Sequence, residues 1–270
     1  MLGKLMKHEF RATARVMGPL YLALVLLAVG ANGSVRLLSS ARNRLLTTVG
    51  GVELFAFGMV IVAVCVMTLV VMINRFRTNL LGNEGYVTLT LPASVHEQVW
   101  AKLLVSTIWA VATMAAICAA AVIAVFRVTY VNTFVEDLRS IMRHLTSYYA
   151  LNGAAFLLEL LALVIVGYFC CCLQFYAAMS VGHSFANHKT LFSVLFFFLF
   201  QIVMQVVGTW SLFASGSSGW VFDFFERFSD VNRMAAVHAL MGVSIAVSAV
   251  VAAVYYFLTT YMLSKHLNLE

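Results

Sequence analysis

The chain has 270 residues, of which 63% are hydrophobic and 10% charged, and its mean hydropathy is +0.95. Soluble domains are typically about 45–50% apolar and about 25% charged, so this composition excludes an ordinary water-soluble globule. The net charge of +6 fits basic residues that face anionic lipid, and no basic cluster interleaved with aromatics points to nucleic acid.

Long continuous apolar runs predict an all-α, polytopic membrane protein, because barrel strands would instead alternate apolar and polar residues over about ten positions. Crossing the hydrocarbon core takes about 20 residues, and six runs are long enough. We expect the spans at residues 17–35, 52–73, 99–126, 154–179, 191–212 and 237–263. Residues 1–270 would then form a single transmembrane domain.

The first 15 residues are amphipathic. Lys4, Lys7, Arg11 and Arg15 alternate with apolar residues at helical spacing. This pattern predicts an interfacial helix over residues 1–15, with its basic face toward lipid headgroups.

Charge sets the expected orientation. Four cations directly precede the first span, and with the N-terminus inside every lysine of the chain falls on the inner side. Both termini are therefore predicted to be cytoplasmic. Residues 74–98 would form an inner loop, and residues 127–150 and 213–236 outer segments, the former with an amphipathic helix over residues 132–149.

The inner loop is longer than a connector needs to be. It begins with a helix-compatible stretch, residues 75–81, and continues through Gly82-Asn-Glu-Gly85, whose glycines permit a tight turn. Tyr86, Leu89 and Leu91 leave apolar surface before Pro92, which ends the segment. An apolar surface on a cytoplasmic loop indicates a docking site for a partner.

Small residues recur every fourth position in the third span, at Ala112, Ala116, Ala120 and Ala124. Such a stripe lets helix backbones approach closely in lipid. It is compatible both with packing inside one chain and with a seam between two copies.

Glu159 lies inside the fourth span, where a carboxylate is costly and should face a cavity, a partner or water. It is either a polar point on a translocation pathway or a residue near the interface that pairs with a cation such as Arg143. Gln174, Gln201 and Gln205 are candidates for the same interior, or for hydrogen bonds between helices.

Three stretches of the chain resemble the permease subunits of ABC-2-type ATP-binding-cassette transporters, particularly the bacterial six-span permeases. They are Leu2-Gly-Lys-Leu-Met-Lys-His-Glu-Phe-Arg11, similar to the elbow helix of that family; Asn83-Glu-Gly-Tyr-Val-Thr-Leu-Thr-Leu-Pro92, followed by Lys102; and Ser180-Val-Gly-His-Ser184 with Lys189. The order of six spans extends the resemblance over the whole chain.

The resemblance implies a transport subunit of the bacterial inner membrane that works with a second permease chain and a separate ATPase subunit. ATP and Mg²⁺ would bind to the ATPase, and this chain would hold no cofactor of its own. Residues 75–81 would form the coupling helix that contacts the ATPase. The coupling residues would be Arg75, Arg77, Leu80, Leu81, Glu84, Gly85, Tyr86 and Pro92.

The chain itself has no Gly-x-x-x-x-Gly-Lys-Ser/Thr phosphate loop, so we do not expect it to be an enzyme. His183 and His188 are five residues apart and do not share a helical face, so no metal site is expected. Export of an amphiphilic or peptide-like substrate is the favoured function.

Other functions remain open at this point. They are import of a small amphiphile, an ion-coupled carrier or channel, and, remotely, a rhomboid-like intramembrane protease. The protease would use a serine of Gly216-Ser-Ser-Gly219, predicted here as a flexible loop, with His238 as its base.

Overall fold

The computed structural model describes residues 2–40, 44–82, 85, 94–124, 153–185, 188–218 and 220–265, together with 133, 135–137, 139–141 and 143. For residues 35–40, 44–46, 210–218 and 220–236 this description covers the backbone. Within these ranges the chain is built from helices and turns, and it contains no strand.

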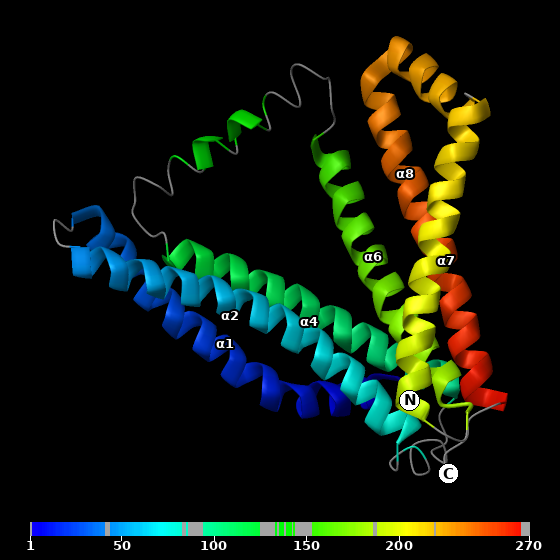
Figure 1. Ribbon diagram of the computed structural model, residues 1–270, viewed down its shortest axis with the longest axis horizontal. Helices are drawn as coiled ribbons and strands as arrows, with labels where there is room; N and C mark the ends of the chain where they lie inside the picture. The colour runs from blue at the N-terminus through cyan, green and yellow to red at the C-terminus, as the bar shows by residue number, and fades with distance from the viewer. Residues whose placement is uncertain are drawn as a thin grey trace. The chain divides into compact units, whose positions relative to one another are not determined.

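Six long helices make up most of the described chain (Figure 1). They are α1 (Leu2–Ser40), α2 (Arg44–Phe76), α4 (Val95–Ala124), α6 (Gly153–Gly182), α7 (Lys189–Ser218) and α8 (Trp220–Lys265). Each contains a stretch that is long and apolar enough to cross a membrane. The structure therefore confirms an all-α fold with six helices of membrane-spanning length, and each predicted span overlaps one of them.

The N-terminal residues do not form a separate element. Helix α1 runs without a break from Leu2 to Ser40, so the structure does not divide the basic segment 1–15 from the first apolar run. Pro19 lies inside α1. A proline removes one backbone hydrogen bond and can kink a helix, but it does not have to end one.

The Gly/Ser-rich segment differs from the sequence-based prediction. Residues 216–218 were expected in a flexible loop, but they form the end of α7, and α8 begins at Trp220. Extending an existing helix costs far less than starting a new one, so a 30-residue helix can continue through weak helix formers. In the other predicted outer segment, the described residues between 133 and 143 are helical.

The chain divides into two compact units. Unit 1 comprises Met1–Arg75 and Glu97–Arg139, and unit 2 comprises Phe76–His96 and Ser140–Glu270. Figure 1 shows α1, α2 and α4 side by side in unit 1, and α6, α7 and α8 in unit 2.

Unit 1 has a core made largely of small and branched side chains. Leu24 and Ala28 of α1 pack against Val64 of α2 and against Ala120 and Ala124 of α4. Two further alanines of the predicted stripe, Ala112 and Ala116, pack against the buried clusters of the same unit. The stripe therefore serves packing within one chain, as one of its two interpretations predicted.

Unit 2 is organised around α6, which packs against both α7 and α8. The rings of Phe175 and Phe197 stack between α6 and α7 with centroids 4.5 Å apart. Near the end of α6 the approach to α7 is closer still, because a Cβ atom built on Gly182 would overlap Ser193. Glycine is thus needed at position 182 for the two helices to meet.

Candidate functional site

The predicted coupling segment continues helix α2. Arg75 and Phe76 are the last residues of α2, and Arg77–Leu81 follow directly as a π-helical turn, η1. Residues 75–81 are therefore helical, as the sequence predicted, but they continue α2 directly, and their coupling role stays a prediction. No glycine or proline separates this stretch from the apolar run before it, so the helix has no sequence signal to stop.

Of the predicted coupling residues, Glu84, Tyr86 and Pro92 lie outside the described residues, as do Leu89 and Leu91. Gly85 is buried, and its N–H donates to the carbonyl of Gly82 at 2.8 Å. A Cβ on Gly82 would lie 2.9 Å from the carbonyl oxygen of Thr78, so the turn after η1 requires a glycine there.

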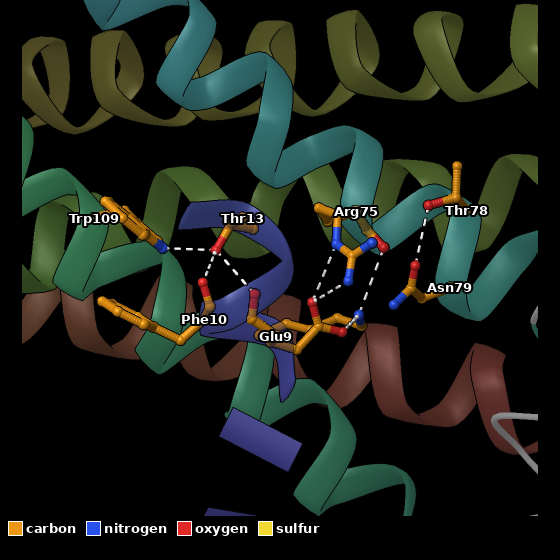
Figure 2. Close-up of polar contacts among 8 residues, drawn as sticks. Glu9, Phe10, Thr13, Arg75, Thr78, Asn79 and Trp109 are labelled. Carbon is orange, nitrogen blue, oxygen red and sulfur yellow. Dashed lines mark hydrogen bonds and ion pairs between the residues drawn. The ribbon is translucent and has the colours of Figure 1, made fainter. Parts of the chain in front are cut away.

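In unit 1, Glu9 of α1 binds one cation from α2 and one from α4. One carboxylate oxygen accepts from Arg75 at 3.1 Å (Figure 2). The other accepts from the Lys102 ammonium at 2.5 Å. The Lys102 side chain is 6% exposed and that of Glu9 is 12% exposed. Lys102 also donates to the carbonyl of Arg75 at 3.5 Å. A single carboxylate thus ties together the ends of three helices, and the cluster carries one net positive charge.

Further polar contacts join α1 to α4 about one and about three helical turns along α1 from Glu9. The indole N–H of Trp109 donates to Thr13 at 2.7 Å, and the Trp109 ring stacks on Phe10 with centroids 4.8 Å apart (Figure 2). The hydroxyls of Tyr21 and Thr113 are 2.7 Å apart. Each of these bonds joins a residue of α1 to a residue about 90 positions later in α4. Together they fix the register of the two helices.

In unit 2, η1 is held by an aromatic stack. The rings of Phe76 and Tyr176 are nearly parallel, with centroids 3.9 Å apart, and both side chains are fully buried. Leu80 and Leu81 are buried as well, while Arg77 and Thr78 are exposed. The predicted coupling stretch therefore has an apolar face packed in unit 2 and a polar face open to solvent.

The turn after α6 contains a buried histidine. The Nδ1 atom of His183 is 2.9 Å from the Met179 carbonyl and 3.5 Å from the Ser193 hydroxyl. Burial lowers the pKa of His183 below its ordinary value of 6.5; the bond to Met179 opposes this shift, and the positive charges of Lys189 and Arg77 add to it. Arg77 of η1 thus acts electrostatically on the Gly182–Ser184 turn that the sequence singled out.

Glu159, predicted on a pathway or paired with a cation such as Arg143, pairs with His238. Its Oε2 is 2.7 Å from Nδ1 of His238 on α8. Both side chains are a little over a quarter exposed and lie within membrane-length stretches. His238 is also the base of the protease alternative, whose serine side chains lie outside the described residues.

The three glutamines do not act as a group. The Gln174 amide on α6 donates to the Gln201 side chain on α7 at 3.0 Å, which is the hydrogen bond between helices that the sequence allowed. Gln205 is exposed, and its backbone carbonyl accepts from Thr209. The structure therefore joins Gln174 to Gln201, and it joins Glu159 to a histidine that sequence reasoning had not paired with it.

The remaining chemistry is sparse. Within the described ranges, no three His, Cys, Asp or Glu side chains come together in a way that could hold a metal ion.

Comparison of the chain with family models, with curated proteins and with solved structures found no match.

Proposed function

We propose that the chain is the membrane-spanning subunit of an ATP-driven transporter of the ABC-2 type, exporting an amphiphilic or peptide-like substrate. In this proposal a separate cytoplasmic ATPase subunit supplies the energy and a second permease chain completes the pathway. The chain sits in a bacterial inner membrane with both termini in the cytoplasm, and residues 1–15 act as the elbow helix.

The observation that carries the proposal is the way Arg75–Leu81 is held. Arg75 is bonded to Glu9, and the neighbouring Phe76 is stacked on Tyr176. Movement applied to η1 would therefore reach buried side chains at once. A segment that transmits force needs such rigid attachment, because a loose loop would absorb the displacement.

The exposed residues of η1 offer the contact surface. Arg77 and Thr78 face solvent, while Leu80 and Leu81 anchor the turn. π-Helical turns are energetically unfavourable and are found frequently at functional sites. In the proposal, Arg77 meets an acidic surface of the ATPase, and Glu84 and Tyr86 complete the contact.

The test is co-purification with candidate ATP-binding-cassette ATPase subunits from the same organism, followed by assay of ATP hydrolysis. The purified chain alone should hydrolyse no ATP, and the complex should be active. Arg77→Glu should lower complex formation or substrate-dependent hydrolysis at least tenfold, since it places a negative charge against an acidic surface. Glu84→Ala and Tyr86→Ala should act in the same direction.

The matched control is Arg139→Glu, which makes the same charge reversal on an exposed residue of the predicted outer segment. It should leave assembly and hydrolysis unchanged. Unaltered coupling in Arg77→Glu would refute the contact surface, and failure of the chain to bind any such ATPase would refute the family assignment.

The Glu159–His238 pair favours a second candidate, a proton-coupled carrier. Ionisable pairs inside a membrane often mark proton relays. In liposomes without ATP, a pH gradient should then drive accumulation of a fluorescent amphiphile such as ethidium, and Glu159→Gln should abolish it. ATP-dependent transport that is insensitive to the gradient would decide for the first proposal.

A further inference from the structure

An open groove lies between the first residues of α4 and the last turns of α8. Its volume is about 740 Å³, and its lining includes Val95 and His96 from α4 and Phe257, Leu258, Tyr261 and Ser264 from α8. Aliphatic and aromatic atoms make up most of this surface. Phe257 is 67% exposed and Tyr261 is 49% exposed, so the groove offers them to a ligand.

Two polar contacts involve residues that line the groove. Nδ1 of His96 and the Tyr256 hydroxyl are 2.6 Å apart. The Lys265 ammonium lies over the Tyr261 ring, 5.5 Å from its centroid. The exposed side chains near the mouth therefore include a lysine and an imidazole.

The position of the groove along the helices is informative. The membrane-length stretch of α4 begins at Val95, and that of α8 ends at Lys265. The groove thus lies at the end of two such stretches, where hydrocarbon gives way to headgroups. Tyrosine and lysine are the residues that typically mark this boundary.

We propose that this groove binds an anionic phospholipid. One acyl chain lies along Phe257 and Leu258, and the phosphate lies at the mouth near Lys265 and His96. An acyl chain fits the apolar floor, and the negative headgroup complements Lys265. A free phosphate ion would make no use of the apolar lining, and a zwitterionic phospholipid carries an ammonium that offsets the attraction of its phosphate to the lysine.

The test uses the full chain, purified in detergent and stripped of lipid, without any ATPase. Binding of dioleoyl-phosphatidylglycerol and of dioleoyl-phosphatidylcholine is measured by native mass spectrometry. The anionic lipid should bind about fivefold more tightly, the contribution of one basic residue near a membrane surface. Lys265→Gln should abolish that preference, and Ser264→Trp, which fills the mouth, should weaken binding of both lipids.

Two controls separate a built site from general attraction. Arg139→Gln removes an equal charge from an exposed residue of the predicted outer segment, and Ala246→Trp adds equal bulk to an exposed position on α8 outside the groove. Neither should change lipid binding. Equal affinity for the two lipids, or equal losses in Lys265→Gln and Arg139→Gln, would overturn the proposal.

Competition identifies the source of the phosphate. Inorganic phosphate at millimolar concentration should not displace the lipid, because it lacks the acyl chain. Effective displacement would show a site for free phosphate and would also overturn the proposal. Since these measurements use the chain alone, their outcome is independent of whether it works with an ATPase.

Discussion

His183 lies in the turn between α6 and α7, outside the membrane-length stretches, and its side chain is buried. Burial holds its pKa below 6.5, so the folded protein keeps the imidazole neutral at pH values where the unfolded chain protonates it. The unfolded state then binds more protons in the window below pH 6.5. Stability is therefore fully present above this window and is lost as the pH falls through it.

We predict that the melting temperature of the purified chain falls when the pH is lowered from 7.5 to 5.5, and that His183→Asn at least halves this fall. Asparagine retains a side-chain N–H donor for the Met179 carbonyl but does not titrate. Thermal unfolding in detergent at several pH values measures the effect.

His188→Asn is the matched control, since His188 is exposed and lies five residues further along the chain. His188 has φ of 54°, a left-handed conformation that asparagine tolerates well, so this change should not strain the backbone. A pH dependence that persists unchanged in His183→Asn would show that another group is responsible.

At the scale of elements, Glu9 joins α1, α2 and α4. The largely buried Lys102 makes the cluster sensitive to which member is removed, because a buried charge without its counter-ion is strongly unfavourable. Removing Glu9 leaves two cations close together. Removing Lys102 leaves Glu9 paired with Arg75.

We predict that Glu9→Gln lowers the free energy of unfolding by about 3 kcal/mol, the cost of breaking a buried ion pair on one side. Lys102→Met should cost clearly less. The double variant should recover part of the loss caused by Glu9→Gln, because it no longer buries an uncompensated ammonium. Chemical denaturation of the four proteins in a double-mutant cycle measures the coupling. If the losses of Glu9→Gln and Lys102→Met simply added in the double variant, the two residues would not be coupled, and the ion-pair cluster would be contradicted.

The helices were largely predictable from the sequence, whereas the residues that pair with one another were not. Apolar runs of sufficient length located all six helices, since the requirement comes from the thickness of the hydrocarbon core. Helix ends were less predictable: α2 passes into η1, and α7 continues to Ser218. Sequence composition sets no stop at these points, so the ends depend on packing contacts such as that of Phe76 with Tyr176.

The site residues show the same limit. Glu9 is separated from Arg75 by 66 residues and from Lys102 by 93, and Glu159 is 79 residues from His238. One local signal was present for Glu9, because it is the lone acidic residue among the four cations of residues 1–15. Nothing in the sequence indicated which histidine would meet Glu159.

At the scale of the whole molecule, the six membrane-length stretches and the proposed orientation fix which loops share a side. Ser94 and Thr133 are exposed and belong to segments predicted on opposite sides. The native cysteines Cys65, Cys118, Cys170, Cys171 and Cys172 all lie within the membrane-length stretches. Replacing them allows each side to be probed with one introduced thiol.

We predict that, in a cysteine-free background, Thr133→Cys reacts with a membrane-impermeant maleimide on intact cells, whereas Ser94→Cys reacts only after lysis. Gel shift of the labelled chain reports the result. Reaction of Ser94→Cys on intact cells would place the 74–98 loop outside and would remove the basis for ATPase coupling.

The helices of this chain cover one another sparingly. In the most apolar window of α7 and of α8, 6% of the residues are buried, and in α1 and α4 the share is 22%. Most of the apolar surface of these helices must therefore be covered by lipid, detergent or another protein chain. A particle extracted from the bilayer will therefore carry a belt of detergent, and its mass in sedimentation or light scattering will exceed the 29.7 kDa of the polypeptide. Apolar substitutions on the lipid-facing surface should be accommodated by the surrounding lipid or detergent, which makes these faces suitable positions for hydrophobic fluorophores.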